Sequence, residues 1–104
     1  MLFRSVVIAP ASGDEPWLAA VRELADWARQ GGAEALVVAL GVDAAAGDPE
    51  SPLAVTPAGF RDAGRALGRL RLPTVVVQEG GYDLGAIGEL VRETLMGIEE
   101  GANG

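Results

Sequence analysis

Two loops of the sequence carry the side chains best suited to chemistry. One begins Gly41-Val42-Asp43 directly after an apolar run, and the other contains Gly80-Gly81-Tyr82 after a second apolar run. The carboxylate of Asp43 could ligate a metal ion or position water, although an isolated loop aspartate more often binds nearby backbone amides. The phenol of Tyr82 could donate a hydrogen bond to a developing oxyanion, although a tyrosine packed at a turn is the plainer interpretation.

Neighbouring residues in these loops add alternatives. Gly80 and Gly81 allow the backbone to approach a ligand or to adopt a positive φ. Asp48, which precedes Pro49, is typical of a turn or cap residue rather than of a metal ligand. An all-oxygen site for Mg²⁺ or Ca²⁺ is a further alternative, disfavoured because acidic side chains in loops usually face water. Its candidate ligands are Asp43, Asp48, Glu79 and Asp83.

Three apolar, largely β-branched runs predict the strands that position the loops, at residues 5–9, 35–40 and 73–77. Apolar residues at helical spacing follow each run and predict three helices, ending in a frayed tail at 99–104. Ser12 and Glu15 have the spacing of a capping box at the start of the first helix. In the second helix, Thr56 is the predicted cap and Pro57 the first residue.

This alternation of strand and helix predicts an α/β fold with a single domain over residues 1–104. We expect a three-layer α-β-α sandwich around a small parallel sheet, built from three β-α units in a Rossmann-like arrangement. Loops that leave the carboxyl ends of parallel strands gather at one edge of a sheet. Residues 41–52 and 78–83 should therefore lie close together, although they are distant in sequence.

Composition excludes several classes of function. Fifteen acidic residues oppose eight arginines, for a net charge of −7, which disfavours binding to nucleic acid or anionic membranes. This charge would suit a cationic ligand such as a polyamine, or it serves solubility alone. The mean hydropathy of +0.24 is high for a small monomer and favours a homo-oligomer. Neither cysteine nor histidine is present, so the commonest zinc ligands and the commonest general base are missing.

The apolar runs are all too short to span a membrane. The apolar stretch near the amino terminus is also too short for a signal peptide and is broken by Pro10. We therefore expect a cytoplasmic protein.

An ordered series of motifs resembles the C-terminal part of the histone deacetylase and acetylpolyamine amidohydrolase superfamily. The series comprises Gly41-x-Asp43 with Asp48-Pro49, then Leu53-x-Val55-Thr56-x-x-Gly59-Phe60, then Leu72 to Tyr82. The likeness extends from about Ser12 to Ile98, nearly the whole chain. It implies that the chain corresponds to a fragment of the larger arginase–deacetylase fold.

The resemblance also implies roles for individual residues. In this family zinc polarises an acetamide carbonyl and activates water. Asp43 would occupy the position of a zinc-ligating aspartate, and Tyr82 that of the tyrosine which stabilises the tetrahedral intermediate. Gly80 and Gly81 would shape the wall of the substrate channel.

The departures from the family pattern are large. The family's remaining zinc ligands come from an upstream Asp-x-His motif and its base from an upstream histidine pair, whereas this chain has no histidine. Because a catalytic zinc takes about three protein ligands, Asp43 alone should not hold it stably. We therefore expect a deacetylase-like chain that is catalytically incompetent by itself.

Two alternatives remain open at this point. The chain could be one half of a split deacetylase, completed by a partner chain that supplies the missing ligands and strands. It could instead be a small-ligand or regulatory module that uses the Gly80-Gly81 loop and the amino terminus of the last helix. Glu79 and Asp83 would repel phosphate at that place.

Overall fold

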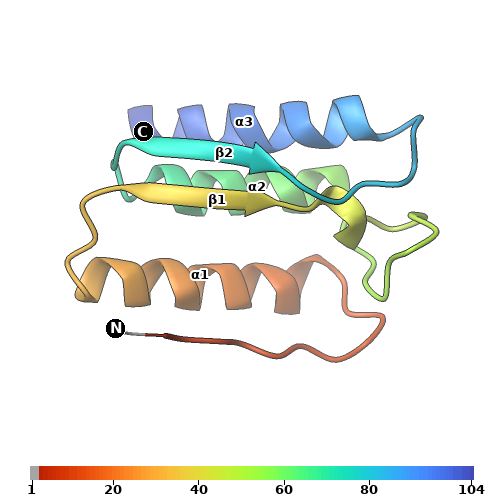
Figure 1. The fold of residues 1–104 in the computed structure, drawn as a ribbon, viewed down its shortest axis with the longest axis horizontal. Helices are drawn as coiled ribbons and strands as arrows, with labels where there is room; N and C mark the ends of the chain where they lie inside the picture. Colours follow the sequence, from red (N-terminus) through yellow and green to blue (C-terminus); the bar gives the residue numbers. More distant parts are fainter. Residues whose placement is uncertain (1–2) are drawn as a thin grey trace.

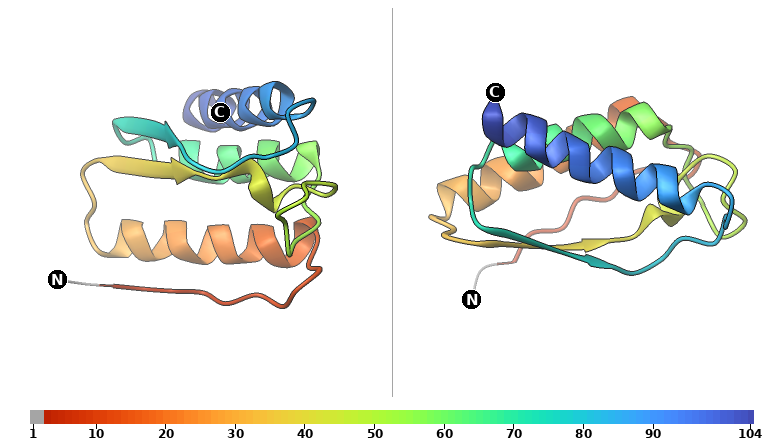
Figure 2. Two further views of the ribbon diagram at one scale, coloured as in Figure 1. Left: turned by 45° about the vertical axis from the view of Figure 1, so that its right-hand side comes forward. Right: turned by 90° about the horizontal axis from the view of Figure 1, so that it is seen from above.

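Three helices lie on the same side of a two-stranded parallel sheet in the computed structural model, which describes residues 3–104 (Figures 1 and 2). The α/β class and the parallel sheet predicted from the sequence are confirmed. In chain order the elements are α1 (Asp14–Gln30), β1 (Leu36–Leu40), the 3-10 turn η1 (Val42–Ala44), α2 (Pro57–Gly68), β2 (Thr74–Gln78) and α3 (Ile87–Asn103).

The sheet pairs β1 with β2 in parallel, from Leu36 opposite Thr74 to Leu40 opposite Gln78. Leu40 is buried toward the helices, whereas side chains on the other face stay in solvent: Val37 is 72% and Val75 60% exposed. Within residues 3–104 the sheet therefore has a helix layer on one face, and the second helix layer of the expected sandwich is not present there.

The segment at 5–9, predicted as a strand, is extended but is not hydrogen-bonded into the sheet. It runs along the side of α1 that faces away from β1 (Figure 1). Val6 and Ile8 are half-buried and border a hollow against α1, and Arg4 forms an ion pair with Glu23 at 3.2 Å. The strand prediction fails here because no strand edge lies next to this segment.

Helix starts differ from one another in how they are capped. The expected capping box of α1 does not form, since Gly13 is the N-cap and the Ser12 hydroxyl donates to the carbonyl of Ala9 at 2.6 Å. The cap of α2 is confirmed, because Thr56 Oγ1 accepts from the Gly59 amide at 3.2 Å. The Asp14 carboxylate also accepts from the amide of Thr56 at 2.7 Å, which joins the starts of α1 and α2.

The predicted frayed tail is instead helical, because α3 continues to Asn103. Four glycines bring α2 and α3 into backbone contact along this stretch. A Cβ added to Gly64 would lie 2.9 Å from the amide nitrogen of Ile98, and one added to Gly101 would lie 3.0 Å from the carbonyl carbon of Arg65. The close contact buries Gly101 and so orders the end of the helix. These glycines are Gly64, Gly68, Gly97 and Gly101.

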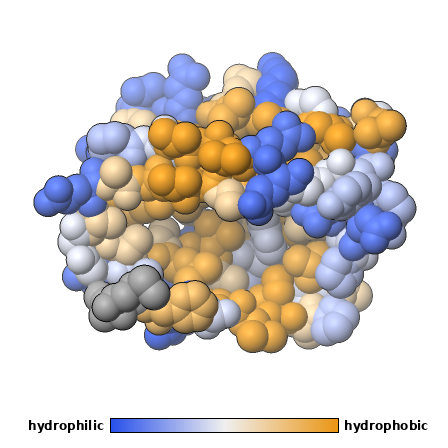
Figure 3. Space-filling model, in the orientation of Figure 1, coloured by the Kyte–Doolittle hydropathy of each residue, from blue (hydrophilic) through white to orange (hydrophobic). Residues whose placement is uncertain are grey.

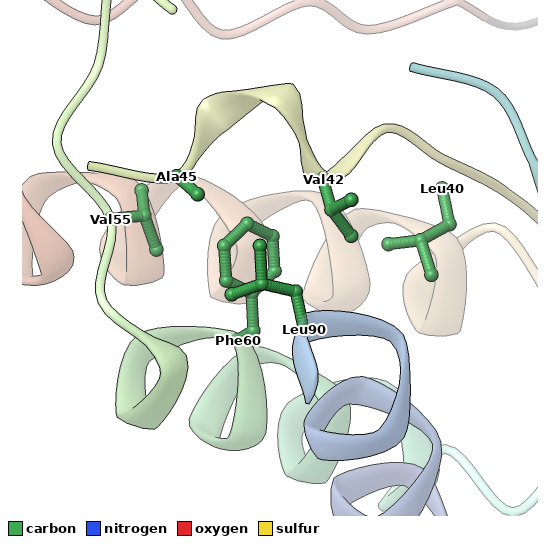
Figure 4. Close-up of a cluster of buried hydrophobic side chains, with 6 residues drawn as sticks. All are labelled: Leu40, Val42, Ala45, Val55, Phe60 and Leu90. Carbon is green, nitrogen blue, oxygen red and sulfur yellow. The ribbon is translucent and has the colours of Figure 1, made fainter. Parts of the chain in front are cut away.

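The core lies beneath η1, where the first loop leaves β1 (Figure 4). Phe60 is fully buried and meets Trp17 edge-on, with ring centroids 5.0 Å apart. The core thus fixes the base of the loop that carries Asp43. Its buried members are Leu40, Val42, Ala45, Val55, Phe60 and Leu90.

Candidate functional site

The two loops predicted to lie together do meet, at the carboxyl edge of the sheet (Figure 1). The amide of Glu79 donates to the carbonyl of Leu40 at 2.7 Å, and the amide of Val42 donates to the carbonyl of Gly80 at 2.9 Å. These bonds continue the pairing of β1 and β2 beyond the strands. The expected proximity of residues 41–52 and 78–83 is therefore confirmed.

Asp43 lies in η1, half-buried, with its carboxylate directly over two glycines. A Cβ on Gly80 would lie 2.7 Å from Oδ1 and 2.8 Å from Oδ2 of Asp43, and one on Gly41 would lie 2.6 Å from Oδ1. Real Cβ atoms do not approach other atoms so closely. Both glycines are therefore needed to leave room for the carboxylate, one contributed by each loop.

Tyr82 stands at the outer end of the second loop with its side chain 53% exposed. Gly81, just before it, has a φ of 151° and packs against Val42, so that a Cβ there would lie 2.7 Å from Cγ2 of Val42. A glycine is required at this position both for its backbone angle and for this close approach. Tyr82 is thus carried by a loop that is pressed against η1.

Asp48 links the two loops, a role that sequence reasoning missed. Its buried carboxylate accepts from the amides of Tyr82 at 2.8 Å and Asp83 at 3.2 Å through Oδ2, and from the amide of Glu50 at 2.9 Å through Oδ1. The bond to Glu50 fits the expected turn. The Asp48-Pro49 pair predicts that turn, but nothing in the local sequence indicates that Asp48 also binds an amide 34 residues away.

Burial by itself raises the pKa of Asp48, but the amides of Tyr82, Glu50 and Asp83 together hold it below its ordinary value. The carboxylate is therefore ionised at neutral pH. Within residues 3–104 the Asp48 carboxylate forms no ion pair, so these three backbone N–H groups stabilise its negative charge.

The acidic residues of the site do not converge on a common point. In the described part of the chain no three acidic side chains are grouped so that they could hold a metal ion. Asp48 has both oxygens occupied by amides, and Glu79 is exposed. An all-oxygen site for Mg²⁺ or Ca²⁺ is not supported by this arrangement. Asp43, as the sole well-placed ligand, does not by itself fit a catalytic zinc, which takes about three protein ligands.

An apolar groove of about 340 Å³ lies between α1 and β1, with α2 behind it. In the space-filling view it is the hollow with an apolar interior below the exposed valines of the sheet (Figure 3). The apolar side chains of the groove are Trp17, Val21, Leu24, Val38, Leu40, Phe60, Ala63 and Leu67.

None of the helices within residues 3–104 combines the length and the apolar composition that a membrane span requires.

Comparison with known sequences gives consistent matches. Residues 4–98 match the histone deacetylase domain family. The acetylpolyamine amidohydrolase of Burkholderia pseudomallei (strain 1710b) is 51% identical over 65 residues, which is 62% of this chain and 18% of that protein. Acetylpolyamine amidohydrolase 1 of Pseudomonas aeruginosa is 35% identical over 95 residues, covering 91% of this chain and 28% of that protein.

Solved structures show the same relationship. A crystal structure of acetylpolyamine aminohydrolase from Burkholderia pseudomallei superposes with a TM-score of 0.88 at 34% identity, over 93% of this chain and 28% of that one. The HD domain of HDA15 gives a TM-score of 0.76 at 28% identity, over 88% of this chain and 26% of that one. The chain therefore spans between 18% and 28% of the length of these relatives.

Proposed function

The chain belongs to the histone deacetylase domain family, and from this premise we propose that it carries part of a deacetylase site and does not catalyse deacetylation alone. The observation behind the proposal is that Asp43 and Tyr82 lie on adjoining loops in a chain that contains no histidine. The relatives are named for hydrolysis of acetylpolyamines, so an acetylated polyamine is the proposed substrate class.

In this role Asp43 is one zinc ligand, and Gly80 and Gly81 form the channel wall beside it. Zinc, when bound in such a site, supplies polarisation of the acetamide carbonyl and an activated water. The half-exposed phenol of Tyr82 is free to turn toward an acetamide and donate a hydrogen bond to its oxygen as negative charge develops. Residues 3–104 supply neither a second and third zinc ligand grouped with Asp43 nor a histidine base that takes the proton from water.

The direct test adds zinc to the purified chain and measures both bound metal and hydrolysis of acetylputrescine. We expect less than one zinc per chain and no turnover, because a single carboxylate binds zinc weakly. The Burkholderia pseudomallei relative serves as positive control in the same assay. Stoichiometric zinc together with turnover by this chain alone would contradict the proposal.

A second candidate function is completion of the site by a partner chain, and the groove between α1 and β1 favours it. The edge of β1 beside the groove is open. Leu36 donates to Pro73, and Leu40 accepts from Glu79, so these β1 residues face β2. In a parallel ladder the alternate residues Val37 and Ala39 then direct their backbone groups to the open edge.

The proposed occupant of that edge is a set of strands from a complementing deacetylase polypeptide. Parallel sheets are normally covered on both faces, whereas here valines of the outer face are 50% to 72% exposed. The good superposition on a chain more than three times as long supports the same idea, since surfaces exposed here are available to the remainder of such a fold. A homo-oligomer is the competing arrangement.

Co-expression tests this second proposal. The tagged chain is produced with a polypeptide made of the Burkholderia pseudomallei relative without the segment that this chain matches. We expect co-purification, which Leu24→Glu in the groove and Ala39→Pro at the open edge should abolish. Leu24 is 36% and Leu95 46% exposed, so Leu95→Glu on α3 is the matched control and should leave the complex intact.

Three results would contradict completion by a partner. The polypeptide could fail to co-purify, it could bind the groove variants as well as the wild-type chain, or sedimentation of the chain alone could show a homodimer that Leu24→Glu dissociates. The last result would assign the groove to a second copy of this chain. A complex that forms but does not hydrolyse acetylputrescine would instead contradict the roles proposed for Asp43 and Tyr82.

A further inference from the structure

Asp48 is the one buried carboxylate of the described chain, and neither the zinc-ligand role nor the oxyanion role uses it. It is 7% exposed, and it follows Gly47, whose φ is 87°. Its own backbone is fixed by turns on both sides: its amide donates to Ala45 at 3.2 Å, and its carbonyl accepts from Ser51 at 3.1 Å. The carboxylate is therefore presented from a rigid part of the first loop.

The second loop depends on this carboxylate for the position of its outer half. Its inner half is held by the bond from Val42 to Gly80. Beyond Gly81, the amides of Tyr82 and Asp83 both donate to Oδ2 of Asp48, and the carbonyl of Asp83 then accepts from Ala86 at the start of α3. Because the Tyr82 side chain is half-exposed, packing does little to fix it, and the position of its backbone decides where the phenol can reach.

We propose that Asp48 is a positioning residue for Tyr82, and that its carboxylate holds the Tyr82 and Asp83 amides and so fixes the backbone from which the phenol projects. The inference rests on the role proposed above for Tyr82. Hydrogen bonds from neutral N–H groups to a carboxylate are about twice as strong as those to neutral acceptors. An uncharged side chain at 48 therefore holds the loop less firmly, even where it fits the same space.

Tyr82 is the only tyrosine of the chain, so a ring-labelled tyrosine gives a single NMR signal that reports its surroundings. The experiment compares this signal, and the hydrogen-exchange rates of the Tyr82 and Asp83 amides, in the wild-type chain, Asp48→Ala and Asp48→Asn. We expect exchange at both amides to accelerate roughly tenfold or more in Asp48→Ala, with a shifted ring signal. Asp48→Asn keeps one acceptor oxygen and should give an intermediate rate.

Asp26→Asn, on the exposed face of α1, is the control for loss of a negative charge and should change neither readout. Circular dichroism establishes that each variant is folded. Should Asp48→Ala fail to fold, acid titration of the wild-type chain replaces it. The Tyr82 signal should then move at a pH below the ordinary aspartate range, and this movement should be absent in Asp48→Asn. Asp43, Glu50, Glu79 and Asp83 remain in that variant, so their titration is separated from that of Asp48.

Unchanged exchange and an unchanged ring signal in Asp48→Ala would overturn the proposal, as would an equal effect of Asp26→Asn. A wild-type signal that stays constant until the whole chain unfolds in acid would overturn it as well. These readouts need no catalysis. Tyr82→Phe in an active co-expressed complex tests the catalytic role of Tyr82 separately, so the two ideas can fail independently.

Discussion

At the scale of residues, the site depends on two glycines whose lack of a side chain leaves space for a neighbouring carboxylate. The carboxylate of Asp43 occupies space that a side chain at Gly41 or Gly80 would fill. From the sequence, Gly80 and Gly81 are interpreted as positions where the backbone can adopt a positive φ or approach a ligand. The structure gives a nearer reason, because the group that Gly80 accommodates is Asp43, from the other loop.

Gly80→Ala should therefore displace the Asp43 carboxylate and lower the midpoint of thermal unfolding by several degrees, as overpacking of about 1–3 kcal/mol does in a small domain. Gly88→Ala is the control, because nothing lies within 4 Å of a Cβ at Gly88, which is in a helix. That variant should be neutral or slightly stabilising. Thermal unfolding followed by circular dichroism measures both, and equal midpoints for the two variants would refute the steric account.

At the scale of elements, the backbones of α2 and α3 are in direct contact. Glycines spaced four apart on both helices let one backbone rest against the other. Beside them, Arg61 Nε donates to Glu100 at 2.8 Å and Arg61 also pairs with Glu93 at 3.0 Å. The sequence contains these glycines at a spacing of four, but it does not show which residues of the other helix they contact.

Gly64→Ala should lower the free energy of unfolding by about 1–3 kcal/mol, since a methyl group there meets the backbone of α3 at Thr94 and Ile98. Urea denaturation measures the change. Ala58→Gly, at an exposed position in the first turn of the same helix, is the reverse exchange and should cost no more than about 1 kcal/mol. A Gly64→Ala variant as stable as wild type would show that the helices separate without cost.

Glu100 makes a pH-dependent contribution to the same contact. Hydrogen bonds from Arg61, then from Arg65, lower the pKa of Glu100 from 4.5 to about 2. A depressed pKa in the folded state gives stability that is present above 4.5 and is lost as the pH falls toward 2. The side chain is 39% exposed, so solvent screening keeps the effect small.

We expect Glu100→Gln to be less stable than wild type at neutral pH, by at most a few degrees in the unfolding midpoint. This difference should shrink steadily as the pH is lowered from 5 toward 2, because Glu100 is progressively protonated as the pH approaches its folded-state pKa of about 2. Thermal unfolding across that pH range gives the measurement. A difference that is independent of pH would mean that packing, not the charge of Glu100, is responsible.

At the scale of the whole molecule, one patch of exposed apolar surface lies over the sheet and the groove beside it (Figure 3). The extended segment at residues 3–9 lies beyond α1, and no strand within residues 3–104 fills the space at the edge of β1. The positive mean hydropathy arises in part from these uncovered valines and leucines. Such a surface is expected where another chain, or more of the same fold, covers it.

Replacing Val37, Val75 and Val77 together by Thr should leave the unfolding free energy within about 0.5 kcal/mol per site, because these side chains are already in solvent. Val42→Thr is the control: Val42 is fully buried, so the hydroxyl should cost about 1–3 kcal/mol. Urea denaturation measures both effects. A large loss of stability in the triple variant would mean that the outer face is covered in solution.

Sequence alone was sufficient for the α/β class, the two paired strands, the three helices and the meeting of the two loops. Each of these follows from local patterns: strand and helix periodicity, turn residues at the boundaries, and the rule that parallel strands end at one edge. The family resemblance was equally readable, because its motifs are runs of neighbouring residues, and the match over residues 4–98 bears it out.

Tertiary structure decided what local patterns do not encode. Val6, Val7 and Ile8 read as a strand, yet a strand needs a neighbouring edge, and none lies next to them. Residues 99–104 read as a tail, yet contact with α2 orders them as helix. Asp48 reads as a turn residue, yet it also binds amides 34 and 35 positions away. In the first case a partner strand is lacking among the described residues, and in the other two the deciding partner is distant in sequence, so each outcome depends on the folded arrangement.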